Sequence, residues 1–125
     1  MRVAGIGFRR AASTASLRDA LERAIGDGLP VQAVATESGK ARAPVFRELA
    51  AALAIPALGV SASDLAQIIT PTQSQRLQNQ FGTGSLAEAA ALVAAGPNAR
   101  LITVRVMSHD NMATAAIADN EGTDT

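Results

Sequence analysis

The chain has 125 residues, 11 acidic and 11 basic side chains, and no cysteine. This length fits one domain, and without cysteine we expect neither disulfides, thiol catalysis nor iron–sulfur clusters. The three phenylalanines are its only aromatic residues. Without base-stacking platforms or a basic surface, neither a nucleic-acid partner nor a membrane partner is expected. No apolar run reaches the roughly 20 residues that span a bilayer, and we expect a cytoplasmic protein with no metal and no cofactor.

In the first half of the chain, short apolar runs alternate with helical patterns. The predicted strands cover residues 3–8, 31–36 and 56–60. The first predicted helix follows a cap at Ser13 or Thr14, the second begins near Pro44, and the third follows a cap at Ser61. A polar loop over residues 37–42 separates the second strand from the second helix.

The second half continues this alternation and then changes it. A short polar helix is predicted over residues 72–80, and Ser85 and Glu88 have the spacing of a capping box that opens an alanine-rich helix. Two strands, residues 101–107 and 112–118, read as a hairpin. We therefore expect one three-layer α/β domain over residues 1–118, with a mainly parallel sheet flanked by helices and a C-terminal antiparallel hairpin. A polar, disordered tail is predicted from residue 119 to residue 125.

In such a sheet, ligands bind at the carboxyl ends of strands, beside helix starts. The first candidate site there contains Gly5, Gly7, Arg9 and Arg10. The glycines allow a close backbone approach and the arginines suit carboxylates. The alternative is a glycine-containing turn with solvated arginines. A dinucleotide site is disfavoured, because Arg10 stands where the third glycine of that fingerprint belongs.

The second candidate site is the loop of Gly82, Thr83, Gly84 and Ser85, with Arg76 about two turns before it. A glycine-rich loop that opens a helix can bind an anion through free N–H groups. It lacks the lysine and the spacing of a P-loop, so a triphosphate is not expected. The competing interpretation is simple capping of the helix.

The third candidate is Lys40, in the loop after the second strand, where a solvated side chain is the competing interpretation. His109 is the only histidine and lies in the predicted hairpin turn. General acid–base chemistry by His109 or Glu88 stays open, but no motif assembles a catalytic set. The residues alone indicate a site for a polyanionic small molecule and no particular reaction.

These segments together resemble the CobE family of cobalamin-biosynthesis proteins, which is similar to the C-terminal domain of CbiG. The resemblance extends from about residue 2 to residue 118. It rests on GIGFRR, on AT-x-x-x-K after the second strand, on FRELAAALAIP, TPTQSQR, GTGSLAEAAAL and AAGPNARL, and on a last strand ending in AAIA. The sequence departs from the family where Ala43-Pro44-Val45 replaces an acidic residue and Pro-Gly, which weakens any catalytic role for an acid near Lys40.

The resemblance implies a role between precorrins and the corrin ring, on the aerobic route. The expected ligand is a precorrin or corrinoid with many acetate and propionate side chains, and other corrin-pathway enzymes are open as partners. CbiG opens a ring lactone and releases acetaldehyde, so a precorrin-lactone hydrolase is the alternative function and whether the protein is an enzyme stays open. A nucleotide-binding module is the third and weakest interpretation.

Overall fold

The computed structural model describes residues 1–70, residue 75 and residues 85–120. Within these ranges, five strands form one mixed sheet in the order β3-β2-β1-β5-β4. The strands are β1 (Arg2–Phe8), β2 (Ala33–Glu37), β3 (Ala57–Val60), β4 (Arg100–Met107) and β5 (Ala113–Asp119). The helices are α1 (Thr14–Ile25), α2 (Pro44–Leu53), α3 (Ala62–Ala66) and α5 (Leu86–Ala95), with a 3₁₀ turn, η1 (Lys40–Arg42), before α2. Of the helix predicted over residues 72–80, all but residue 75 lies outside the described residues.

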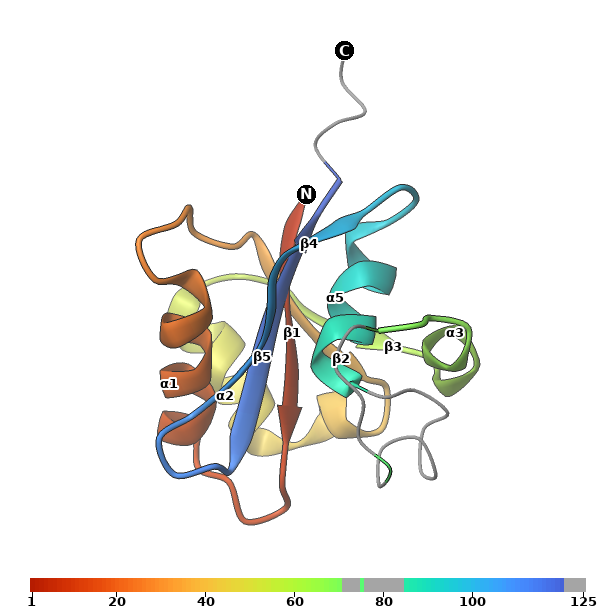
Figure 1. Cartoon of the computed structure of the whole chain (residues 1–125). Coiled ribbons are helices and arrows are strands. Elements are labelled where there is room, and N and C mark those ends of the chain that lie inside the picture. The colour runs from red at the N-terminus through yellow and green to blue at the C-terminus, as the bar shows by residue number, and fades with distance from the viewer. Residues whose placement is uncertain (71–74, 76–84, 121–125) are drawn as a thin grey trace.

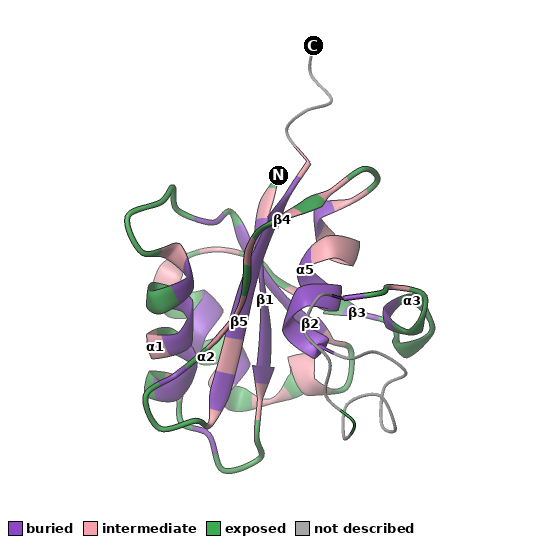
Figure 2. Cartoon of the chain, in the orientation of Figure 1, coloured by how far each residue is buried: buried purple, intermediate pink, exposed green. Residues whose placement is uncertain are grey.

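The sheet is the middle of three layers (Figure 1). Helices α1 and α2 cover one face, and α5 with the short α3 covers the other. The strands at the centre are buried along most of their length, and exposed residues gather on the outer helix surfaces and the loops (Figure 2). This arrangement confirms the predicted three-layer α/β domain. No helix in the described ranges is long and apolar enough to cross a membrane.

The predicted C-terminal hairpin is confirmed, and its second strand lies inside the sheet, between β1 and β4. Strand β5 pairs antiparallel with β1 along its whole length, from Arg2 opposite Asp119 to Phe8 opposite Ala113. Strand β5 therefore ends one residue beyond the predicted strand, and Arg2 Nε lies 3.4 Å from a carboxylate oxygen of Asp119. Of the predicted tail, residues 121–125 lie outside the described residues.

Four of the five strands run in the same direction. Strands β1, β2 and β3 are parallel neighbours, and β4 is antiparallel to β5, which is itself antiparallel to β1. The ends of β1, β2, β3 and β4 therefore lie at one edge of the sheet, which we call the carboxyl edge. Every chain segment that leaves this edge starts a helix or a turn, so the loops predicted to bind a ligand converge there.

Candidate functional site

Gly5 of β1 allows the backbone of α5 to pack directly on the sheet. A Cβ atom on Gly5 would overlap the carbonyl oxygen of Ala87 and lie 2.7 Å from the backbone nitrogen of Ala91. A Cβ atom on Gly7 would lie 2.6 Å from Thr114 Oγ1. Packing therefore requires glycine at position 5, because backbone atoms of α5 fill the space that a side chain would need. The consequence for the site is that the first turn of α5 lies directly over the end of β1.

Lys40 is fixed at the end of β1. Its ammonium group donates to the carbonyl oxygen of Phe8 at 2.7 Å and lies 4.5 Å from the centroid of the Phe8 ring. The ring of Phe8 is itself stacked on Phe46, with centroids 6.3 Å apart. The backbone N–H of Lys40 donates to Glu37 at 3.1 Å. These contacts are more than a solvated loop lysine makes, and they place a positive charge at the peptide that joins Phe8 to Arg9.

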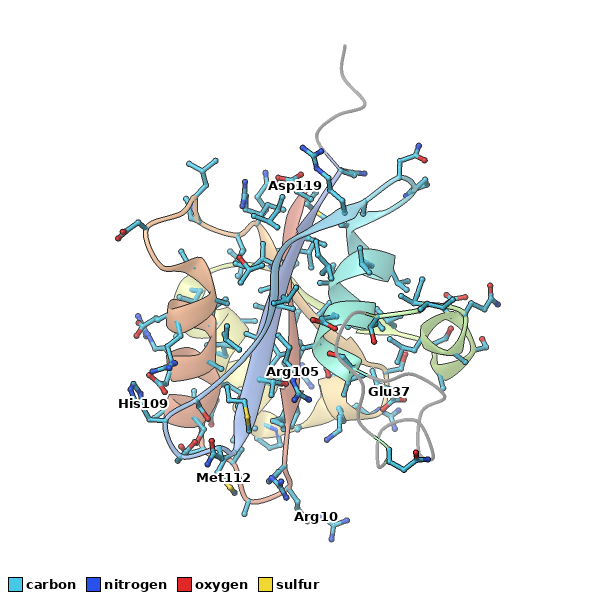
Figure 3. The ribbon with its side chains drawn as sticks, in the orientation of Figure 1. Arg10, Glu37, Arg105, His109, Met112 and Asp119 are labelled. Atoms are coloured by element: carbon cyan, nitrogen blue, oxygen red, sulfur yellow. The ribbon has the colours of Figure 1, made fainter. Side chains whose placement is uncertain are left out.

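Arg9 and Arg10 follow this peptide directly, and both side chains are exposed. The backbone N–H of Arg9 donates to the carbonyl oxygen of Met112 at 2.9 Å, which extends the pairing of β1 and β5 by one step. Figure 3 shows Arg10 beyond the end of β1, at the carboxyl edge. The structure therefore brings Arg9, Arg10 and Lys40 together around one strand end, as the sequence predicts.

The start of α5 is only partly the predicted capping box. Ser85 is fully buried, and its hydroxyl accepts the N–H of Glu88 at 3.3 Å. The fully buried Glu88 carboxylate does not return to Ser85 within the described residues. Its Oε2 accepts instead from the backbone N–H of Arg105 on β4, at 2.8 Å. The cap interpretation of Ser85 is confirmed, and the second half of the box is wrong because β4 offers Glu88 another donor.

The start of α1 is closed by the protein's own side chains. Ser13 and Ser16 form a complete capping box, in which each hydroxyl accepts the other's backbone N–H. Ser16 also donates to the carboxylate of Asp110 at 2.6 Å, and Ser108 donates to its other oxygen at 2.6 Å. These two hydroxyls, Ser108 first, lower the pKa of Asp110. A carboxylate of the protein itself thus lies beside the start of α1, bonded to the hydroxyl of Ser16.

Comparison with known proteins now identifies the chain's family. The family model described as cobalamin synthesis G C-terminus matches residues 2–118. The chain belongs to this family.

Solved structures of two relatives support the membership of this CbiG C-terminal family. CobE, a protein from the cobalamin (vitamin B12) biosynthetic pathway, is 32% identical with a TM-score of 0.80, and the match covers 94% of this chain and 92% of CobE. The cobalamin biosynthesis protein chiG from Agrobacterium tumefaciens is 32% identical with a TM-score of 0.72, over 96% of this chain and 98% of chiG.

A third likeness shows the fold alone. A cobalamin biosynthesis protein G homologue from Sulfolobus solfataricus is 18% identical with a TM-score of 0.70, over 95% of this chain and 36% of that protein. No curated protein sequence matches the chain.

Several predicted site residues of this family member are not placed. Arg76, Gly82, Thr83 and Gly84 lie outside the described residues, so their part in the site stays a prediction. In the ranges that are described, no cluster of three histidine, aspartate or glutamate side chains could hold a metal ion.

Sequence reasoning missed how the hairpin turn is fastened to α1. The backbone N–H of His109 donates to Asp19 at 2.7 Å, and this bond is the main reason that the pKa of Asp19 is lowered. The guanidinium of Arg23 donates to Nε2 of His109 at 2.6 Å. Since Arg23 can only donate, Nε2 must accept, which leaves the proton on Nδ1 facing Asp19 at 3.0 Å. His109 is therefore an exposed side chain that connects the β4–β5 turn to α1 by hydrogen bonds.

Proposed function

We propose that this protein binds a carboxylate-rich corrinoid or precorrin intermediate at the carboxyl edge, on the aerobic route that the resemblance to CobE implies. The observation that carries the proposal is the convergence of Arg9, Arg10 and Lys40 on the end of β1, beside the first turn of α5. In a family of cobalamin biosynthesis proteins, the anion that such an edge would meet is a ring bearing acetate and propionate groups.

The local electrostatics support this placement of the ligand. Two of the three cations are exposed side chains that follow the end of β1, and the third, Lys40, is held at the same strand end by its bond to Phe8. Arginine binds carboxylates with two parallel hydrogen bonds and lysine adds a point charge. Asp110 lies beside the start of α1 and Glu88 lies in the first turn of α5, so the basic side chains are the positive features that would face a ligand.

A visible-absorbance titration tests the proposal, because corrinoids absorb visible light. The probe is cobyrinic acid, whose peripheral carboxylates are free, and the control ligand is its fully methylated ester, which has the same ring without those charges. The protein variants are Arg9→Ala with Arg10→Ala, and Arg100→Ala as a matched control. Arg100 is an exposed arginine at the start of β4, away from the carboxyl edge.

The wild-type protein is expected to bind the acid and to bind the ester much more weakly. The double variant should bind the acid about tenfold more weakly, since two exposed charge contacts of about 0.7 kcal/mol each add to about 1.4 kcal/mol. Equal binding of acid and ester, or equal loss in Arg100→Ala, would remove the carboxylate site. Mass analysis of a recovered lactone-bearing intermediate separates binding from hydrolysis.

A further inference from the structure

Strand β4 contains an extra residue close to the carboxyl edge. Thr103 pairs with Ile117 and Val106 pairs with Ala115, so three steps along β4 match two steps along β5. Arg105 lies inside this bulge, and its backbone N–H is the group that the buried carboxylate of Glu88 accepts. Bulges next to binding sites often turn a side chain in a new direction. Here a fully buried acid on α5 fixes the main chain of the bulge.

The side chain of Arg105 lies on the α5 side of the sheet. Within the bulge, residues 104 and 105 both lie opposite Ala116, which pairs with Gly5 of β1, and the open side of Gly5 faces α5. Figure 3 shows Arg105 beside the first turn of α5. Strand β4 reaches the carboxyl edge at Met107, opposite Thr114, which is itself opposite Gly7. Arg105 is thus near the carboxyl edge, on the strand that β5 separates from β1.

Arg105 has no internal counter-ion within the described part of the chain. It is half-buried, and its guanidinium makes no ion pair or hydrogen bond there; Glu88 contacts its main chain and not its side chain. The carboxylate in the first turn of α5, that of Glu88, is buried and accepts from the main chain of the bulge. A guanidinium with no carboxylate bound to it within the described residues is available to pair with a carboxylate of a ligand.

We propose that the guanidinium of Arg105 binds a carboxylate of the ligand and that Glu88 is the positioning residue that holds it there. This inference rests on the proposed function and deepens it, since it adds a second contact on the α5 side of the carboxyl edge. A planar guanidinium in a fixed bulge selects a carboxylate at a defined distance from those bound by Arg9 and Arg10. Arg105 would therefore help to determine which pattern of ring side chains is accepted.

A double-mutant cycle tests this pair with cobyrinic acid as the titrated ligand. The variants are Arg105→Gln, Glu88→Met, Glu88→Gln and the double variant Glu88→Met with Arg105→Gln, and Arg100→Gln is the control at the other end of the same strand. Arg105→Gln is expected to weaken binding about tenfold. Glu88→Met should weaken it as much, because methionine cannot accept the N–H. Glu88→Gln keeps an accepting oxygen and should bind within about twofold of wild type.

The double variant should bind no more weakly than either single variant, since both remove the same contact. The inference is overturned if Arg105→Gln binds cobyrinic acid as well as the wild-type protein does. The positioning role of Glu88 is overturned if Glu88→Gln and Glu88→Met lose affinity to the same extent. If Glu88→Met does not fold, the Arg105→Lys variant tests the contact instead. It should keep part of the affinity for cobyrinic acid, and full affinity or complete loss would contradict two-pronged recognition of a carboxylate by the guanidinium. If wild type itself does not bind, the proposed function fails and this inference with it.

Discussion

Replacing Gly5 with alanine measures how tightly α5 is held against β1. Gly5 has an ordinary strand conformation, which alanine adopts easily, so without a clash the change would stabilise the protein by about 0.4–1 kcal/mol. The added Cβ would instead overlap the backbone of Ala87 and lie 2.7 Å from the nitrogen of Ala91. Both obstacles are backbone atoms of a helix, and helix and sheet must therefore separate. Overpacking typically costs 1–3 kcal/mol, and we expect about 3 kcal/mol here.

Gly7→Ala is the matched control on the same strand. Its Cβ would meet Thr114 Oγ1 at 2.6 Å, a side-chain atom that can rotate away, so a cost of about 1 kcal/mol is expected. Thermal melting should show a midpoint lowered by about 12 °C for Gly5→Ala and about 4 °C for Gly7→Ala, at about 4 °C per kcal/mol. A Gly5→Ala protein that melts at or above the wild-type temperature would refute the packing argument and return Gly5 to the ligand.

Two further changes probe the helix starts. Ser85→Ala should lower the stability measured by thermal melting by about 0.5–2 kcal/mol, because Ser85 is a buried helix cap. It should have little effect on the binding of cobyrinic acid, and a large loss of affinity with unchanged stability would contradict the cap role. The pKa values of Asp19 and Asp110 are lowered from 3.8, so their contribution to stability is fully present above that value and is lost as the pH falls through the lower folded-state values. Melting between about pH 5 and about pH 2.5 should therefore depend less steeply on pH in Asp110→Asn than in wild type, and identical slopes would exclude Asp110 as a contributor.

Local patterns in the sequence predicted most of the elements. Helix α1 begins after a Ser13 cap, α2 begins at Pro44 in its first turn, and the hairpin strands are within a few residues of their predicted bounds. Caps and apolar periodicity are determined by neighbours in the chain, so they can be read without knowing the fold. The position of β5 between β1 and β4 could not be predicted in this way, because it depends on pairing with a strand more than 100 residues earlier.

The candidate site was predicted in part for the same reason. The carboxyl-edge rule brought Arg9, Arg10 and Lys40 together, but it could not show that Lys40 bonds to Phe8. A glycine pair signals only that something approaches the backbone closely. At Gly5 that neighbour is α5, and no local pattern distinguishes an approaching helix from an approaching ligand. Ser16 and Asp110 are 94 residues apart, and no local pattern predicts their contact.

The location of the ligand is the central claim, and amide chemical-shift mapping tests it most directly. The uniformly ¹⁵N-labelled protein would be titrated with cobyrinic acid while backbone amide resonances are followed. We expect the largest changes at the carboxyl edge, at Arg9, Arg10, Lys40 and Arg105, and little change at Arg100 and Gly96, which lie toward the opposite edge. Shifts concentrated at that opposite edge, or no shifts at concentrations well above those in the absorbance titration, would contradict the account.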